Sequence, residues 1–493
     1  MKTQSNRKKD LTCLSIIYLC YILVLLVTSA FTSPLYPHYY GDDSALFSLL
    51  GKGILEGKIL YVDLFDHKGP IIFFINALGQ QLGGYNGIFF LQTVFGLVSL
   101  TFLYYTSKKL ESKDKTVAER ILFFILVYAV YFYLLQQGNR TEEYAQPFIS
   151  AALFLFVKYA TGCKENSEHV SHPPFYALCY GVILGCLAFL RLNDAVTVCA
   201  GILAIFIFLI YKKKYANLLK NLLAGIAGMA LVAVPICLYF RHHGALYDML
   251  YGTFLYNFKI VGQSGKEQFL DHIFKFTVLY LPIAISCILL VAHLVKERKI
   301  RFLDFLLGCI LLFNIIIFCL ANRYPHYFAS FVPAYLVFLF RYFTFNKKKV
   351  ISYIIVVCTI VNLLHAGFYA ALSFRYCHII KQANVRYCAV KSITDAIPES
   401  ERDSVIGFNI PVSYYVLGDI IPCYKYYTWQ WSWSRVDPQI LVDFHQWVRT
   451  EKPLWILVTP REANPELSEI LHAQYEMIAG NDSLISFRLK ETE

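Results

Sequence analysis

The sequence predicts an α-helical integral membrane protein that carries a small α/β domain at its C-terminal end. Of its 493 residues, 57% are hydrophobic and only 16% are charged, and the mean hydropathy is +0.49. A soluble domain carries about 25% charged residues. Apolar runs recur along most of the chain at roughly the 20 residues that a helix needs to cross a bilayer. Beyond about residue 372, short strand-like runs replace them.

The apolar runs predict about eleven membrane-spanning helices. They lie at about 11–31, 86–106, 121–136, 146–160, 175–190, 195–211, 219–240, 275–295, 302–320, 327–345 and 350–371. Lysine and arginine clusters fill alternate connections, and all of them are cytoplasmic if the N-terminus is cytoplasmic. These clusters account for the net charge of +11 and do not indicate nucleic-acid binding. We therefore expect a transmembrane domain over 1–371 and an outer, extracytoplasmic domain over 372–493.

The N-terminal basic residues and the cysteines do not change this prediction. Lysines and arginine before the first apolar run resemble a signal peptide, but the run is long enough to be kept as a span. Most cysteines lie inside apolar runs, where they behave as small buried hydrophobes. Cys377, Cys388 and Cys423 lie in the outer domain, and two of them could pair if that side is oxidising. The cysteine spacing indicates no zinc site.

The outer connections collect the polar residues that need an explanation. They are the long first loop 32–85, the short segments 138–143 and 191–194, the loop 241–274, and residues 322–326. Charge beside a bilayer is costly unless it lines a wet cavity or a site. The convergence of these segments on one face predicts a functional site there.

The first loop opens with two adjacent carboxylates, Asp42 and Asp43. Apolar residues follow at helical spacing (Leu46, Phe47, Leu50 and Ile54) and predict a short helix at the membrane interface with its apolar face toward the membrane. Carboxylates at a helix N-terminus cap its backbone N–H groups. The alternative role for Asp43 is that of a general base.

The end of the first loop carries Asp63, Asp66, His67 and Lys68, directly before Gly69-Pro70. A lysine at this depth can extend its ammonium to the interface as a simple anchor. Alternatively, its ammonium neutralises a phosphate that leaves when a glycosidic bond breaks. Asp63, Asp66 and His67 are candidates for contacts to an acceptor or a metal ion.

Five further residues on the outer face are candidate site residues, and each of them also has an ordinary structural explanation. Glu142 and Glu143 belong to a solvated loop, or supply a second carboxylate that binds a divalent ion or orients an acceptor. Arg191 and Arg323 anchor span ends, or grip a phosphate in bidentate fashion. His326 packs, or donates a hydrogen bond to the same phosphate. The identity of any metal ion is left open.

The C-terminal segment predicts a small α/β domain. Strand-like runs lie at 404–408, 454–458 and 483–487, and helical stretches lie around 435–450 and 464–474. Six aromatic residues cluster between them: Tyr424, Tyr426, Tyr427, Trp429, Trp431 and Trp433. They form part of the domain core or interface, or they stack on a sugar acceptor.

These residues together resemble a known family, the polytopic membrane glycosyltransferases of the GT-C fold. The resemblance is carried by Asp43-Ser44-Ala45-Leu46-Phe47, by residues 57–63 (Gly-Lys-Ile-Leu-Tyr-Val-Asp) and by Asp66-His67-Lys68-Gly69-Pro70. Arg191-Leu192-Asn193 and residues 323–328 with Pro333 add weaker support. The chain is most similar to the bacterial branch related to protein O-mannosyltransferases and lipid A aminoarabinose transferase, over roughly residues 10–345. Lys-Gly-Pro stands where some relatives have Lys-Pro-Pro.

The resemblance implies transfer of a sugar from a polyprenyl-phosphate donor to a lipid, glycan or protein acceptor, with inversion. Asp43 then matches the family's candidate base, and Asp42 matches it less well. Lys68 matches the lysine near the donor phosphate, with Arg191, Arg323 and His326 as further phosphate ligands. Glu142 or Glu143 would stand where relatives carry an acidic residue in the second outer loop. No cofactor is required, although a divalent metal remains an option.

Two other classes of function fit part of the pattern. A lipid-linked sugar flippase or another transporter would also have many spans, but it tends to carry charges at the bilayer midplane and to show repeated halves. A non-catalytic assembly protein would explain the outer domain but not the first-loop carboxylates. The composition favours a bacterial inner membrane, with the N-terminus cytoplasmic and the C-terminal domain periplasmic or extracellular.

Overall fold

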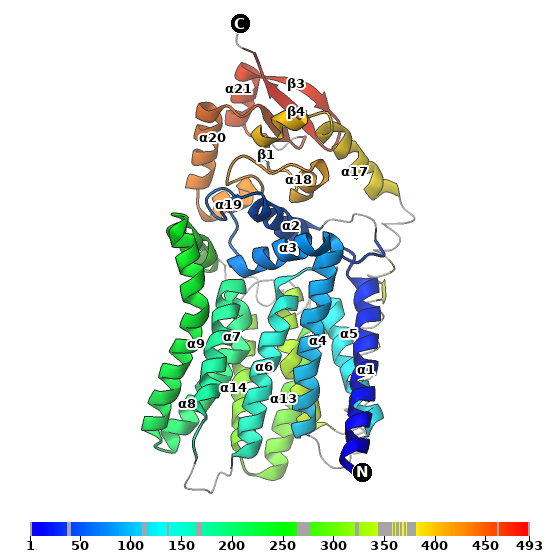
Figure 1. Cartoon of the computed structure of the whole chain (residues 1–493), viewed down its shortest axis with the longest axis vertical. Helices are drawn as coiled ribbons and strands as arrows, with labels where there is room; N and C mark the ends of the chain where they lie inside the picture. Colours follow the sequence, from blue (N-terminus) through cyan, green and yellow to red (C-terminus); the bar gives the residue numbers. More distant parts are fainter. Residues whose placement is uncertain are drawn as a thin grey trace. The chain divides into compact units, whose positions relative to one another are not determined.

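The computed structural model describes most of the chain and groups it into two units (Figure 1). The described residues are 2–36, 41–110, 116–135, 138–163, 170–263, 277–320, 325–343, 381–460 and 463–491, with isolated positions between 357 and 371. Unit 1 comprises Met1–Leu35, Phe89–Cys237 and Gly265–Ala371. Unit 2 comprises Tyr36–Ile88, Leu238–Ser264 and Leu372–Glu493.

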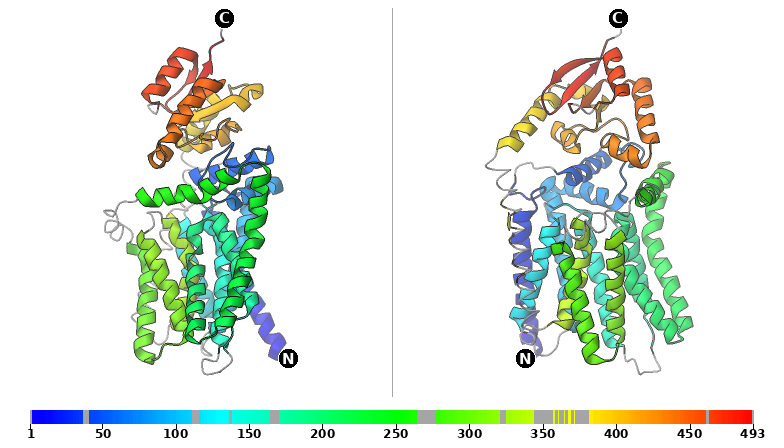
Figure 2. Two further views of the ribbon diagram at one scale, coloured as in Figure 1. Left: turned by 90° about the vertical axis from the view of Figure 1, so that its left-hand side faces the viewer. Right: turned by 180° about the vertical axis from the view of Figure 1, so that it is seen from behind.

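Unit 1 is a bundle of long apolar helices that run side by side (Figure 2). Its helices are α1 (Lys2–Thr28), α4 (Tyr85–Leu110), α5 (Val117–Leu135), α6 (Thr141–Gly162), α7 (Pro174–Leu190), α8 (Val196–Tyr211), α9 (Tyr215–His242), α13 (Thr277–Glu297), α14 (Phe302–Leu320) and α15 (Val332–Tyr342). The first four residues of α4 and the last five of α9 are counted with unit 2. Two 3-10 turns, η1 (Leu192–Ala195) and η3 (Pro325–Phe331), precede α8 and α15. Among these elements α8 packs on α14, α6 on α7, and α5 on both α1 and α15.

Most of the predicted spans correspond to helices of unit 1, and the protein is a multi-pass membrane protein. Within the described residues, five helices are long and apolar enough to cross a bilayer: Lys8–Thr28, Tyr85–Leu110, Val117–Leu135, Leu192–Tyr211 and Tyr215–His242. Two shorter apolar helices cover Pro174–Leu190 and Phe302–Phe318. The span expected at 327–345 begins as the 3-10 turn η3 and continues as α15. The span expected at 350–371 lies almost wholly outside the described residues, so the total of eleven stays a prediction.

Unit 2 begins with two short helices of the first loop, α2 (Asp42–Leu55) and α3 (Pro70–Gly83). The helix predicted after Asp42 is confirmed, and Leu46, Phe47 and Leu50 are buried. Their face is covered by protein, because α2 packs on α3 and on α18 (Val412–Gly418). The expectation that this face lies toward the membrane is therefore wrong. Helix α3 begins with a proline in its first turn, where the missing N–H costs nothing.

The segment 246–263 also belongs to unit 2 and is helical rather than the loop expected from the sequence. It contains α10 (Leu246–Leu250), a π-helical turn η2 (Tyr251–Leu255) and α11 (Tyr256–Gln263). Residues 264–276 of the expected loop lie outside the described residues.

The C-terminal part of unit 2 is the predicted α/β fold around a four-stranded sheet. Its strands are β1 (Val405–Phe408), β2 (Trp455–Val458), β3 (Tyr475–Gly480) and β4 (Ile485–Leu489), and its helices are α17 (Lys381–Thr394), η6 (Glu399–Ser404), α18, α19 (Gln430–Val436), α20 (Gln439–Glu451) and α21 (Pro465–Gln474). The strand order is β1-β2-β4-β3, with β1 parallel to β2 and the other pairs antiparallel.

Local sequence explains most of these elements. Strands β1 and β2 are buried at every position, as expected for the continuous apolar runs of a parallel pair. Asn464 caps α21, because its side chain accepts a hydrogen bond from the backbone N–H of Leu467 at 2.8 Å. Strand β3 was not expected from the sequence, and most of its residues are exposed.

Candidate functional site

The first loop brings Asp43 and Lys68 together through the packing of α2 on α3. Asp43 lies in the first turn of α2, and Lys68 lies two residues before α3. The rings of Phe47 and Phe73 connect the two helices, with centroids 6.0 Å apart. As a result, Lys68 Nζ lies 3.6 Å from a carboxylate oxygen of Asp43.

A second carboxylate, Asp66, holds the same lysine from the buried side. Asp66 is 0% exposed, accepts a hydrogen bond from the backbone N–H of Lys68 at 2.8 Å, and lies 3.9 Å from Lys68 Nζ. His67 Nδ1 is 3.8 Å from the other Asp66 oxygen. The side chains of Lys68 and Asp43 are 15% and 25% exposed. A buried carboxylate is costly unless it is paired. Lys68 is therefore a counter-ion for Asp66, and Asp43 is its more exposed partner.

Side chains from neighbouring segments hold the backbone of this turn. Tyr61 donates its hydroxyl hydrogen to the carbonyl oxygen of Lys68 at 2.8 Å, and Thr253 donates to the Tyr61 hydroxyl at 3.3 Å. Burial raises the pKa of Tyr61 well above its ordinary value, so the phenol stays protonated and remains a donor. Asn257 donates its amide to the carbonyl oxygen of His67 at 2.6 Å.

The π-helical turn η2 approaches the same backbone so closely that it needs a glycine. A Cβ at Gly252 would lie 2.7 Å from a ring carbon of Tyr61 and 2.9 Å from the carbonyl oxygen of Asp66. Real Cβ atoms do not approach backbone this closely, so a side chain here would displace the turn that carries Asp66. π-helical turns occur often at functional sites.

The C-terminal domain contacts the residue next to the buried carboxylate. The backbone N–H of Phe65 donates to the carbonyl oxygen of Lys425 at 3.0 Å. The Phe65 ring packs against Tyr256, Tyr426 and Trp433, with centroids 5.5, 5.3 and 5.2 Å away. Part of the predicted aromatic cluster therefore belongs to a hydrophobic core, which is one of the two interpretations given above. This core also includes Phe65 of the first loop.

Two ion pairs add to this contact within unit 2. Lys52 Nζ lies 2.5 Å from a carboxylate oxygen of Asp419, and Lys259 Nζ lies 2.7 Å from Asp437. Tyr251 also donates to Asp437. Although partial burial acts in the opposite direction, the hydrogen bonds from Lys259 and Tyr251 hold the pKa of Asp437 below its ordinary value.

Asp63, a further candidate, closes a local turn. Its carboxylate accepts a hydrogen bond from the backbone N–H of Ile59 at 2.6 Å, and its own N–H donates to the carbonyl oxygen of Ile59 at 2.9 Å. These contacts stabilise the turn between α2 and Asp66. Asp63 therefore has a structural task that the sequence spacing did not indicate.

A second charged cluster lies in unit 1, at the end of α7 and the start of α6. Arg191 follows α7 directly and forms an ion pair with Glu142, which is 1% exposed. The guanidinium of Arg191 also stacks on the ring of Tyr327, 3.7 Å from its centroid. His326 Nε2 lies 4.0 Å from the same Glu142 oxygen. Three of the predicted residues, Glu142, Arg191 and His326, are thus brought together.

Asp194 belongs to this cluster but was not among the candidates. It is 2% exposed, lies 3.8 Å from Arg191, and accepts a hydrogen bond from the hydroxyl of Ser330. Its second oxygen has no hydrogen-bond partner among the described residues. The signal was present in the sequence as a carboxylate three residues after Arg191, between two apolar runs.

Glu143 lies in a separate buried network. The segment 138–143 was expected to be a loop, but Glu142 and Glu143 form the first turn of α6 and are both buried. The possibility of a solvated loop is therefore wrong for them. Glu143 accepts hydrogen bonds from Gln92 and from the backbone N–H of Arg140, both at 2.9 Å. Gln92 in turn contacts Ser29 and Thr32 of the segment that follows α1.

Some candidates fall outside the described residues. They are Arg323, Cys377 and the side chain of Asp42. The other two cysteines of the C-terminal domain, Cys388 and Cys423, are free thiols. Within the described ranges, no group of three or more histidine, cysteine or acidic side chains is arranged to hold a metal ion. The roles expected for the candidate residues stay predictions.

Solved structures with the same fold support the resemblance seen in the sequence. ArnT from Cupriavidus metallidurans bound to undecaprenyl phosphate matches with a TM-score of 0.56 at 11% identity, covering 96% of this chain and 97% of that chain. The Archaeoglobus fulgidus oligosaccharyltransferase in its apo form matches with a TM-score of 0.58 at 12% identity, covering 91% and 69%. The oligosaccharyltransferase AglB from Archaeoglobus fulgidus, in complex with an inhibitory peptide and a dolichol-phosphate, matches with a TM-score of 0.51 at 12% identity, covering 91% and 69%. The expected GT-C fold is thereby confirmed.

Sequence comparison gives the family. No curated protein matches the chain. The family model described as "Putative competence-induced protein Ccs4 N-terminal domain" matches residues 4–372, well over half of the chain. The protein therefore belongs to the family of the competence-induced protein Ccs4 N-terminal domain, built on the GT-C fold.

Proposed function

We propose that this protein is a membrane glycosyltransferase that moves a sugar from a lipid-phosphate donor to an acceptor hydroxyl. The observation that carries the proposal is the arrangement of Asp43, Lys68 and Asp66, in which one lysine lies between a buried and a more exposed carboxylate. The fold supports it, since the matching ArnT structure holds undecaprenyl phosphate and the matching AglB structure holds a dolichol-phosphate.

In the proposed reaction, two side chains each contribute to one step. The Asp43 carboxylate accepts the proton of the acceptor hydroxyl, and the oxygen attacks the anomeric carbon of the sugar. The bond between that carbon and the phosphate oxygen breaks, and its electron pair leaves with the lipid phosphate. The Lys68 ammonium stabilises this leaving charge. Attack from the face opposite to the phosphate inverts the anomeric centre, and a phosphate leaves without a general acid.

The burial of the two carboxylates supports Asp43 as the base. Asp66 is 0% exposed and already accepts the backbone N–H of Lys68, so an acceptor hydroxyl has no access to it. The Asp43 side chain is 25% exposed and lies in the first turn of α2, so an acceptor hydroxyl can reach it. When the donor binds, the Lys68 ammonium can contact the donor phosphate in place of Asp43, while Asp66 continues to hold the ammonium.

The remaining candidates stay predictions within this proposal. Arg191, Arg323 and His326 are expected to contact the donor phosphate, and Glu142 or Glu143 to orient the acceptor or a divalent ion. The ion pair between Arg191 and Glu142 supports a role for the pair as a unit, because each neutralises the other in a buried place. The expected location is a bacterial inner membrane, with a lipid, glycan or protein as acceptor.

A transfer assay with the purified protein tests this function. Polyprenyl-phosphate sugars of several kinds are supplied with a membrane extract, and wild type is compared with Asp43→Asn. We expect turnover to fall by about 10²–10⁴-fold in Asp43→Asn, which is the usual contribution of a general base. Glu56→Gln is the matched control, because Glu56 is an exposed carboxylate just beyond the end of the same helix.

Two outcomes would contradict the proposal. Wild-type turnover in Asp43→Asn would remove Asp43 from the mechanism. Movement of labelled lipid across vesicles that depends on the protein, with no sugar transfer from any donor, would favour the transporter alternative.

A further inference from the structure

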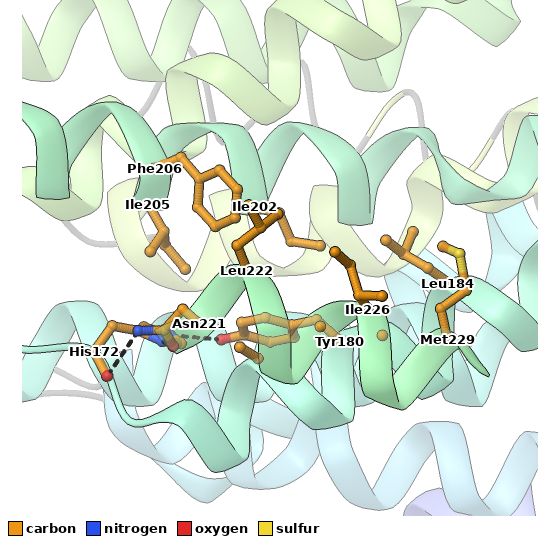
Figure 3. A pocket seen from close by; sticks show the side chains of 13 residues that line it. His172, Tyr180, Leu184, Ile202, Ile205, Phe206, Asn221, Leu222, Ile226 and Met229 are labelled. Atoms are coloured by element: carbon orange, nitrogen blue, oxygen red, sulfur yellow. Dashed lines mark hydrogen bonds between the residues drawn. The ribbon is translucent and has the colours of Figure 1, made fainter. Parts of the chain in front are cut away.

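A cavity of about 210 Å³ lies between α7, α8 and α9 in unit 1 (Figure 3). Apolar side chains line most of its length, among them Leu184, Ile202, Leu222, Ile226 and Met229. An apolar cavity of about 150 Å³ already stays dry and binds a benzene ring. This cavity therefore has room for a segment of an apolar chain.

One end of the cavity is closed by a polar group that is fully hydrogen-bonded. His172 is 1% exposed, and its Nδ1 lies 2.7 Å from the side-chain oxygen of Asn221. Tyr180 lies 3.5 Å from the other ring nitrogen, and the Asn221 amide donates to the carbonyl oxygens of His172 and Asn217. Burial lowers the pKa of His172 to about 4, so the ring is neutral at ordinary pH. The side chain that bounds this end of the cavity is therefore neutral and does not offer a charge to a bound molecule.

The cavity faces the lipid along α9. The most apolar window of this helix is only 6% buried inside the protein, and Leu223, Ile226 and Leu231 are strongly exposed. Helix α9 approaches α7 closely at glycines: a Cβ at Gly181 would collide with the carbonyl oxygen of Gly225. Helices α7 and α9 meet at the glycines, and beside this contact a gap remains between them and α8. In a membrane, lipid chains lie next to this gap and can enter it.

Three consecutive lysines lie at the same end of the cavity as His172. Lys212, Lys213 and Lys214 form the turn that joins α8 to α9, the two helices on either side of the gap. Asn221 follows Lys214 by seven residues, about 10 Å along a helix. Basic residues at a membrane surface attract anionic headgroups. We propose that this groove holds the acyl chain of an anionic phospholipid whose phosphate contacts the lysine turn.

The position of the groove separates it from the donor proposed above. Helix α7 runs from Pro174, beside His172, to Leu190, next to Arg191. The lysine end of the groove thus lies at the opposite end of α7 from the Glu142–Arg191 pair, about 25 Å away for a 17-residue helix. A lipid bound here is a structural or regulatory ligand and not the sugar donor.

Photo-crosslinking in a bilayer tests the proposal. The full chain is placed in nanodiscs of phosphatidylcholine that contain a minor fraction of phosphatidylglycerol with a diazirine on its acyl chain. After illumination, we expect labels concentrated on 202–206 and 222–229, and several-fold fewer labels from a phosphatidylcholine probe. Ile226→Trp fills the groove and removes these labels. Leu223→Trp, an exposed position outside the lining, is the matched control and retains them.

The charge contribution is tested separately. Exchange of Lys212, Lys213 and Lys214 for glutamine abolishes the preference for phosphatidylglycerol, whereas the same exchange at Lys296 and Lys299 leaves it intact. Labels spread evenly over the lipid-facing side of α9 in wild type would overturn the proposal, whether or not any variant folds. Equal labelling by both probes would also overturn it, as would displacement of the phosphatidylglycerol probe by excess polyprenyl phosphate.

Discussion

Replacement of Lys68 by methionine is expected to destabilise the protein as well as to abolish transfer. Methionine keeps an unbranched side chain that is one heavy atom shorter, but it removes the ammonium that lies 3.9 Å from Asp66, a carboxylate with 0% exposure. At this distance and an effective dielectric constant of about 20, the lost attraction is about 4 kcal/mol. Removal of one partner of a buried ion pair costs about 3–5 kcal/mol in the same range.

A second substitution separates the two effects. Asp66→Asn removes the buried charge, so the double variant Asp66→Asn/Lys68→Met has no unpaired carboxylate at the fully buried position, and only the more exposed Asp43 still lacks the lysine. We expect the double variant to recover most of the stability that Lys68→Met loses. It should not recover sugar transfer, because the ammonium that faces the leaving phosphate is still absent.

Thermal unfolding in detergent and the transfer assay give the two measurements. All variants are heated at one scan rate, because unfolding of large membrane proteins is often irreversible. Lys68→Arg serves as the control that keeps the charge at the site. A Lys68→Met protein as stable as wild type would refute the account of Asp66, and so would a double variant no more stable than Lys68→Met.

Three other predictions concern different parts of the chain. Trp433→Ala should lower the stability of unit 2 by about 3–5 kcal/mol. It should also lower turnover, because Trp433 packs on Phe65, the residue before Asp66. Trp431→Ala should have a much smaller effect on both, because the Trp431 side chain is 37% exposed. Because His172 has its pKa lowered from 6.5 to about 4, the unfolded chain binds its proton first, so stability should fall by about 3 kcal/mol as pH drops from 6.5 to 4 and this loss should vanish in His172→Gln. Gly181→Ala should destabilise the α7–α9 contact by about 1–3 kcal/mol, as measured by thermal unfolding, whereas Gly162→Ala has open space around it and should be neutral.

Much of the helical architecture could be predicted because it depends on local hydropathy. The runs at 195–211 and 302–320 match α8 and α14 within a residue. The short helix after Asp42 was visible for the same reason, since apolar residues recur at helical spacing. The strands at 405–408 and 455–458 were visible as continuous apolar runs between turn residues.

The candidate site could be predicted only in part. Asp43 and Lys68 were found because their segments resemble a family, and the structure brings the two side chains within 3.6 Å. Asp194 was overlooked although it follows Arg191 by three residues, because this spacing does not by itself show that the carboxylate is buried beside the arginine. The burial of Glu142 and Glu143 was also missed, since hydropathy alone assigns adjacent glutamates to solvent.

By itself, the sequence determined where the apolar helices of unit 1 lie, that the C-terminal part is an α/β fold, and which loop carries the candidate residues Asp43 and Lys68. Each of these follows from residues close together in the chain. The tertiary structure decided that Phe65 packs on Trp433 and that Asp194 receives a hydrogen bond from Ser330. The partners in these contacts are far apart in sequence, and many pairings satisfy the same local pattern. Only the packing of the whole unit selects one of them, because only there are the buried charges paired and the aromatic surfaces covered.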